Sequence, residues 1–172
     1  MAVTLNETPS GNRLHIGIFG KTNSGKSSFI NTFSGQKVSI VADVAGTTTD
    51  PVYKSIEIYP LGPCVLIDTA GFDDEGELGA LRIEKTSLAA QKTELAIILF
   101  CGDEMVQELK WYNYFKKRQT SVIPVLGKAD LYTQEQKEYL IQMIQKNTGE
   151  TVCPVSSETG EGIRKLKELL AE

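Results

Sequence analysis

Eight residues, Gly20 to Ser27, constrain the fold of this chain more strongly than any other part of its sequence. They read Gly-Lys-Thr-Asn-Ser-Gly-Lys-Ser and lie between the apolar run Leu14–Phe19 and the predicted helix Lys26–Ser34. The glycines permit a tight turn whose backbone N–H groups point inward, and the helix N-terminus adds the positive end of its dipole. This combination binds phosphate and requires strand, turn and helix in that order.

Short apolar runs alternate with longer amphipathic segments along the rest of the chain, a pattern typical of a mostly parallel sheet covered by helices. The predicted strands are Leu14–Phe19, Val52–Tyr59, Cys64–Ile67, Leu95–Phe100, Val122–Leu126 and Val152–Val155. The predicted helices are Lys26–Ser34, Leu78–Ala90, Glu104–Lys117, Thr133–Asn147 and Gly162–Leu170. The tight turn Pro60–Pro63 predicts that the second and third strands are antiparallel neighbours. We therefore expect an α/β fold with a six-stranded, mostly parallel sheet, one antiparallel edge strand and about five helices.

Bulk properties limit the partners that this chain is expected to bind. Its 172 residues suit one compact domain, and a formal net charge of −4 gives no general attraction for nucleic acid. The longest apolar run, Leu95–Cys101, is too short to cross a membrane. Residues 1–12 lack the pattern of a signal peptide and are expected to form a flexible tail. We therefore expect a soluble, cytoplasmic domain over residues 13–172 that contacts neither nucleic acid nor membrane.

The residue types that often carry metal sites are sparse and scattered. Cys64, Cys101 and Cys153 each lie in or beside an apolar run, and no pair of them has metal-ligand spacing. They are expected to be packed, reduced thiols. His15 is the only histidine and falls in the first predicted strand, so we expect a sheet residue rather than a catalyst or a ligand.

Phosphate and Mg²⁺ ligands are predicted at three places along the chain. In the first motif Lys26 is expected to reach the β- and γ-phosphates and Ser27 to bind Mg²⁺. Asp68 follows an apolar strand and is expected to hold Mg²⁺ through water, while the Gly71 N–H contacts the γ-phosphate. One of the threonines at positions 47–49, with Thr48 as the candidate, supplies a second Mg²⁺ ligand. The remaining predicted phosphate contacts are Asn23, Ser24, Gly25 and Ser28.

Two later segments predict recognition of guanine. Gly127-Lys128-Ala129-Asp130 follows an apolar strand, and Asp130 can accept hydrogen bonds from guanine N1 and N2, a donor pair that adenine lacks. Lys128 can lie across the purine. The segment Ser156-Ser157-Glu158, after the last predicted strand, would place backbone and a hydroxyl near guanine O6.

In this order the five motifs resemble the translation-factor class of GTPases, the branch with the Era-like and tRNA-modification GTPases. The resemblance implies a P-loop NTPase fold, a three-layer sandwich, and Mg²⁺-dependent hydrolysis of GTP to GDP. One residue departs from the pattern, because the fourth motif usually begins with Asn or Thr and here begins with Gly127.

Two longer strings are more specific. Thr47–Ile58 and Pro60–Thr86 resemble the HydF family, the maturation GTPases of FeFe-hydrogenase. Full members carry a dimerisation domain and an iron–sulfur domain, which we expect to be absent from this chain, so no iron–sulfur cluster is expected here. The resemblance implies the radical-SAM maturases and the hydrogenase as partners, with a monomeric isolated domain and a homodimeric full-length protein.

The resemblance also bears on catalysis. Many GTPases carry a water-orienting Gln where this chain has Phe72, so another group must stabilise the transition state. In potassium-activated relatives an Asn three residues before the phosphate-loop Lys binds K⁺, and Asn23 has that position. Lys26, Asn23 and Thr48 are thus the predicted catalytic residues. The water-orienting group stays open among Asp73, Asp74, Glu75 and Glu77.

Two alternative functions remain open from the sequence. One is a ribosome- or tRNA-associated GTPase of the same branch. The other is a non-catalytic, GTP-dependent switch, which Phe72 and Gly127 suggest.

Overall fold

A computed structural model of the chain describes residues 13–21, 25–34, 52–58, 62–68 and 87–170. All structural statements below concern these residues. Several predictions fall outside them: the tail at residues 1–12, and the roles of Asn23, Ser24, Thr48, Gly71 and Phe72.

Six strands form one sheet in the order β2-β3-β1-β4-β5-β6. The strands are β1 (Leu14–Phe19), β2 (Val52–Ile58), β3 (Gly62–Asp68), β4 (Leu95–Phe100), β5 (Ser121–Leu126) and β6 (Cys153–Pro154). β2 lies at one edge and pairs antiparallel with β3, while the other pairs are parallel. The predicted sheet is confirmed, including its antiparallel edge strand.

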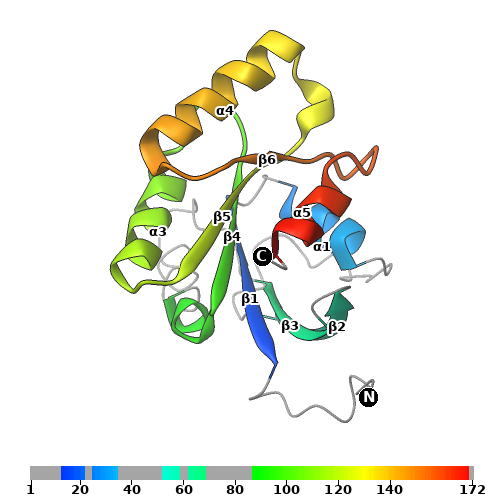
Figure 1. The fold of residues 1–172 in the computed structure, drawn as a ribbon, viewed down its shortest axis with the longest axis vertical. Helices are drawn as coiled ribbons and strands as arrows, with labels where there is room; N and C mark the ends of the chain where they lie inside the picture. Colours follow the sequence, from blue (N-terminus) through cyan, green and yellow to red (C-terminus); the bar gives the residue numbers. More distant parts are fainter. Residues whose placement is uncertain (1–12, 22–24, 35–51, 59–61, 69–86, 171–172) are drawn as a thin grey trace, which may run out of the picture.

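Helices cover both faces of this sheet (Figure 1). The helices are α1 (Lys26–Ser34), α3 (Val106–Lys117), α4 (Gln134–Thr148) and α5 (Ile163–Leu170), with a further helical stretch at residues 87–92. α1 and α5 lie on one side of the sheet and α3 and α4 on the other, which confirms the three-layer sandwich. Of the described helices, none is long and apolar enough to span a bilayer.

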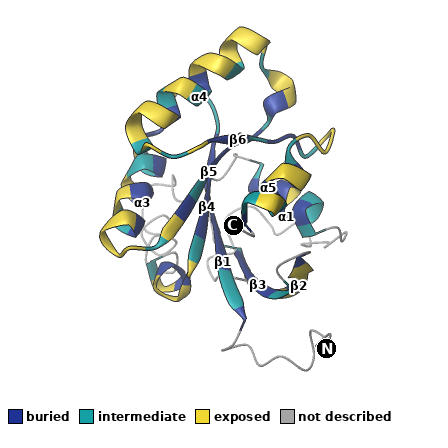
Figure 2. Ribbon diagram, viewed as in Figure 1, coloured by how far each residue is buried: buried dark blue, intermediate teal, exposed yellow. Residues whose placement is uncertain are grey.

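Two large apolar clusters and a small third one, Val65, Ile67 and Ala89, lie between the layers of the described residues, and β1 contributes to both large clusters. Ile16 and Ile18 face the cluster under α1 and α5, whereas Phe19 faces the cluster under α3 and α4. All three side chains are completely buried. This explains why the central strands are apolar throughout: side chains on both faces leave water. Figure 2 shows the consequence, with the central strands buried and the outer face of α4 exposed.

Most strand and helix boundaries differ from the predictions only at their ends. The predicted helix Leu78–Ala90 lies mostly outside the described residues, which show a helix at residues 87–92. Two further elements differ from the predictions. β6 has two residues instead of the predicted four at Val152–Val155. It pairs only with Val125 and Leu126 of β5. Pro124 therefore lies outside that short ladder, which explains how a proline is accommodated inside β5. A 3-10 helix, Ala129–Leu131, was not expected, because three residues carry no periodicity to detect.

Candidate functional site

The carboxyl ends of the parallel strands bring the phosphate-loop motif and Asp68 together. Ile18 in β1 pairs with Asp68 in β3, so the turn after β1 begins beside the Asp68 carboxylate. Lys26 is the first residue of α1, and its Nζ lies 3.6 Å from Asp68 Oδ1. Both side chains are largely buried, with exposed fractions of 8% and 16%. A cation and an anion from distant segments thus meet at one edge of the sheet.

Gly25 requires the conformational freedom of glycine. Its φ is +84°, in the left-handed region, and a Cβ added there would lie 3.3 Å from Cε of Lys128. The Lys128 side chain therefore passes over the backbone of the phosphate-loop motif. Lys128 itself has a φ of +56°, an uncommon value for a residue with a side chain. Backbone strain of this kind costs about 1–3 kcal/mol and gathers at functional sites.

The carboxylate of Asp130 is held by a buried hydroxyl from the end of the chain. Ser156 Oγ donates to Asp130 Oδ1 at 2.7 Å and accepts from the Thr159 N–H at 3.2 Å. Ser156 is wholly buried. The Ser156 hydroxyl is thus engaged by Asp130, and Ser157 from the same segment lines the pocket beside it.

Backbone hydrogen bonds connect the two loops that carry these residues. The Ala129 N–H donates to Val155 O at 2.9 Å, and the Gly127 N–H donates to Phe100 O at 2.9 Å. Thr32 in α1 donates its hydroxyl to Ser157 O at 3.3 Å. The end of β4, the 3-10 helix and the loop after β6 therefore form one connected frame beside α1.

Gly162 closes this frame from the start of α5. Its φ is +77°, and an added Cβ would come within 2.0 Å of Pro154 O. The turn before it is bonded back to Ser156, because the Ser156 N–H donates to Glu161 O at 3.0 Å. Only glycine permits α5 to approach β6 this closely.

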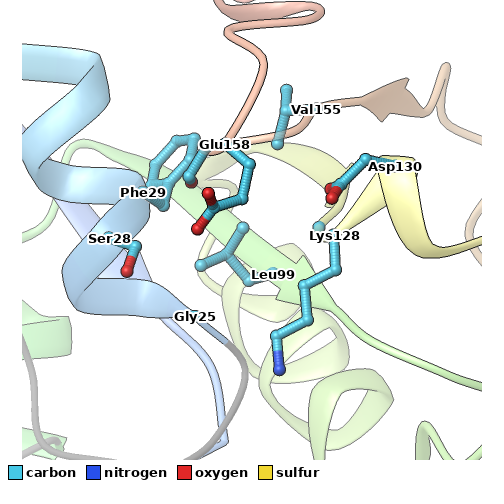
Figure 3. Close-up of a pocket in the computed structure, with 10 residues that line it drawn as sticks. Gly25, Ser28, Phe29, Leu99, Lys128, Asp130, Val155 and Glu158 are labelled. Carbon is cyan, nitrogen blue, oxygen red and sulfur yellow. The ribbon is translucent and has the colours of Figure 1, made fainter.

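A pocket of about 420 Å³, its open mouth included, lies between α1 and these two loops (Figure 3). Lys128 extends across it toward Gly25, while Ser28 and Phe29 border it from α1. Lining the pocket are Gly25, Ser28, Phe29, Leu99, Gly127, Lys128, Asp130, Val155, Ser157 and Glu158. Apolar walls with a few fixed polar groups are typical of ligand sites. A flat base could stack between the Lys128 stem and the apolar wall, with its donor edge toward Asp130.

The residues present also suit Mg²⁺, which prefers hard oxygen ligands. The Ser27 hydroxyl is exposed in the first turn of α1, and the Asp68 carboxylate ends β3 next to the same turn. The structure thus brings together seven predicted site residues from the phosphate-loop segment, the end of β3 and the base segment: Gly25, Lys26, Ser27, Ser28, Asp68, Lys128 and Asp130. Ser156 and Ser157 join the base side of the site.

Several residues of the site were not found from the sequence. The apolar wall of the pocket is formed by Phe29, Leu99 and Val155. The sequence pattern around these residues predicts only that they belong to the hydrophobic core. Glu158 belongs to the predicted segment Ser156-Ser157-Glu158, but the sequence assigned no role to its side chain, which lies at the pocket (Figure 3). Thr32 had no local signal at all, since its bond to Ser157 O joins residues far apart in the sequence.

Residues 15–151 match the protein-family model described as 50S ribosome-binding GTPase. The chain is 35% identical over 173 residues to GTPase Der from Wolinella succinogenes, an alignment covering 95% of this chain and 36% of the relative. It is also 35% identical over 153 residues to tRNA modification GTPase MnmE from Aliarcobacter butzleri, covering 83% of this chain and 33% of that protein. The chain thus spans about a third of the length of these curated relatives.

Solved structures give the same result for the fold. Era from Aquifex aeolicus bound to GDP and AlF4⁻ superposes with a TM-score of 0.77 and 25% identity, covering 91% of this chain and 55% of that one. A structure of Era with MgGDPNP and nucleotides of 16S ribosomal RNA gives a TM-score of 0.77 and 26% identity, with the same coverage of 91% and 55%.

Proposed function

This chain is a P-loop GTPase of the Era/Der/MnmE type within the 50S ribosome-binding GTPase family, and we propose that it acts as a Mg²⁺-dependent switch that hydrolyses GTP to GDP and phosphate. The proposal rests on the contact between the phosphate-loop segment and the base segment. Lys128 lies over Gly25, and Asp130 is fixed by Ser156. One nucleotide would therefore be held at both ends by a single rigid frame.

Each end of the nucleotide has its own group of residues. Asp130 would accept from guanine N1 and N2, and the stem of Lys128 would cover the purine. Lys26 would stabilise charge on the β- and γ-phosphates as water attacks the γ-phosphorus and the bond to the β-phosphate oxygen breaks. Ser27 and Asp68 would hold Mg²⁺, which when bound neutralises phosphate charge. Thr48, Gly71, Ser24 and the K⁺ ligand Asn23 remain proposals from the sequence motifs.

Nucleotide binding and turnover test this proposal directly. Fluorescent GDP displaced by GTP, GDP or ATP should give affinities that favour guanine by at least tenfold, because the donor pair of guanine is matched to Asp130. Phosphate release should require Mg²⁺. A Lys116→Met variant serves as the control, since Lys116 pairs with Glu150 at 2.7 Å on the outside of α3. Equal affinity for ATP and GTP would contradict the assignment.

The cellular setting has two candidates, and the relatives favour the first. The named relatives are GTPase Der, a tRNA modification GTPase and Era with ribosomal RNA. We therefore propose a ribosome- or tRNA-associated process as the setting. The net charge of −4 gives this domain no general attraction for RNA, so RNA contacts would come through a local surface or through a partner.

Maturation of FeFe-hydrogenase is the second candidate, supported by the strings Thr47–Ile58 and Pro60–Thr86. None of the relatives named above is a hydrogenase maturation factor. The partners would then be radical-SAM maturases and the hydrogenase. Co-sedimentation of the GTP-bound protein with ribosomal subunits supports the first setting. Co-purification with a radical-SAM maturase, and no ribosome association, supports the second.

A further inference from the structure

The buried face of α3 contains a carboxylate where an apolar side chain is typical. Glu108, Trp111, Tyr112 and Phe115 are the buried residues of this helix, spaced so that they share one face. Glu108 is completely buried, whereas glutamate is almost never buried without a partner. Its partner comes from outside the helix.

That partner is Lys21, the second residue of the phosphate-loop motif. Lys21 Nζ lies 3.5 Å from Glu108 Oε2 and donates a 2.6 Å hydrogen bond to the backbone oxygen of Glu104. The Lys21 side chain is 20% exposed and that of Glu108 only 1%. The start of the loop is therefore attached to the segment that begins α3.

Aromatic packing adds a second attachment at Phe19, the last residue of β1 and two residues before Lys21. Phe19 stacks on Trp111 with ring centroids 5.7 Å apart and meets Phe115 edge-on at 4.9 Å. Phe19 and Lys21 thus anchor the two sides of Gly20 to the same helix face. The ion pair and the aromatic contacts together fix where the chain leaves β1.

Stability alone does not account for such a pair. Taking two charges out of water costs several kcal/mol per ion, and apolar replacements of similar volume are often neutral or stabilising. A buried pair that connects two segments can instead fix their relative position.

We infer that Glu108 is a positioning residue for the nucleotide, acting through Lys21 to hold the phosphate loop in its binding conformation. The inference rests on the proposed GTPase function. If the residue at the start of the loop is already held, less conformational freedom is lost when phosphate binds, so the Lys21–Glu108 ion pair is expected to raise nucleotide affinity. Without Glu108, Lys21 keeps its hydrogen bond to the Glu104 backbone oxygen but loses the ion pair, so the start of the loop is held less firmly before the nucleotide binds.

The sign of the effect separates positioning from simple charge attraction. Glu108→Gln removes a negative charge close to the phosphate site, and this change alone would strengthen the binding of an anionic nucleotide. If the Lys21–Glu108 ion pair positions the loop, Glu108→Gln should instead weaken nucleotide binding. Neutralisation of Glu108 is therefore more informative than removal of Lys21, where both effects point the same way.

The experiment measures Mg-GDP affinity and thermal unfolding of the nucleotide-free domain side by side. Glu108→Gln should weaken GDP binding roughly tenfold, a coupling within the usual range for residues in contact. Lys21→Arg keeps the cation and should bind GDP within about twofold of the unmodified domain. The double variant Lys21→Met/Glu108→Leu should keep its melting temperature yet bind GDP at least as weakly as Glu108→Gln.

The ion pair Lys116–Glu150 provides the control, because it also starts on α3 but lies on the outside. Lys116→Met should leave GDP affinity unchanged. Emission of Trp111, the only tryptophan, reports whether the aromatic packing survives in each variant. GDP affinity within twofold of the unmodified domain in both Glu108→Gln and the double variant would overturn the inference. Failure of the unmodified domain to bind guanine nucleotides would instead overturn the proposed function.

Discussion

Removal of the Ser156 hydroxyl tests whether Asp130 must be held in place for the proposed selectivity for guanine. Ser156→Ala deletes the donor that lies 2.7 Å from Asp130 Oδ1 and the acceptor of the Thr159 N–H. Ser156 is fully buried, whereas Asp130 lies at the open pocket, so only the pocket side of the carboxylate stays in contact with solvent in the variant. The Asp130 carboxylate then loses the contact that fixes its rotation.

The size of the effect follows from the charge on the acceptor. A hydrogen bond to a charged group contributes about 1.5–3 kcal/mol. Asp130 lines an open pocket and can regain part of this from solvent, so the lower end applies. About 1.4 kcal/mol is tenfold in affinity, and we expect GDP to bind roughly tenfold more weakly to Ser156→Ala.

Inosine diphosphate supplies the decisive comparison, because it lacks the 2-amino group of guanine. Competition titrations should show that the unmodified domain prefers GDP to IDP and that Ser156→Ala loses most of this preference. Thr133→Ala is the matched control, since it removes a capping hydroxyl at α4 at a stability cost of about 1 kcal/mol. That variant should keep both affinities. If Ser156→Ala bound GDP as tightly as the unmodified domain, with the same preference over IDP, the positioning of Asp130 by Ser156 would be refuted.

Three further changes have defined outcomes. Lys26→Ala should abolish phosphate release while the far-UV circular dichroism stays native; retained turnover would place the chemistry elsewhere. K⁺ should raise turnover well above Na⁺ at matched ionic strength, and Asn23→Ala should remove that difference; equal rates in both salts would exclude a K⁺ site. Burial raises the pKa of the Cys64 thiol from 9.0 to about 11, so the unfolded chain releases this proton first. The unfolding free energy should therefore fall as pH rises from 9 toward 11, and Cys64→Ala should reduce that slope in urea titrations.

The sequence predicts the parts of this fold that depend on long apolar runs. β1, β4 and α1 begin and end at the predicted residues, because burial on both faces of a strand or one face of a helix leaves a periodic signal. β6 falls short of its prediction because it lies at the sheet edge and contains Pro154, which has no N–H to extend the ladder.

The site was predicted in its residue types but not in its internal contacts. Lys128 adopts a left-handed backbone that nothing in a lysine side chain favours, and the loops fixed by the Ala129–Val155 bond impose it. Glu108 in a helix reads as one more solvent-facing acid, although its carboxylate is buried against Lys21. Both cases depend on partners that are distant in the chain, and local pattern carries no information about those partners.

The hydrogen bond between Asp130 and Ser156 means that the phosphate-loop segment and the base segment are completed at different times during synthesis on the ribosome. Lys26 and its helix leave the exit tunnel early, but Ser156 and the glycine that docks α5 follow only near the end of the described chain. Domains acquire structure from the N-terminus as they are made. If Asp130 reads guanine as proposed, a nascent chain that has passed Asp130 but lacks Ser156 would carry the phosphate-loop motif before the group that fixes the base-reading carboxylate. Selectivity for guanine would then be completed only after the phosphate-loop segment has emerged.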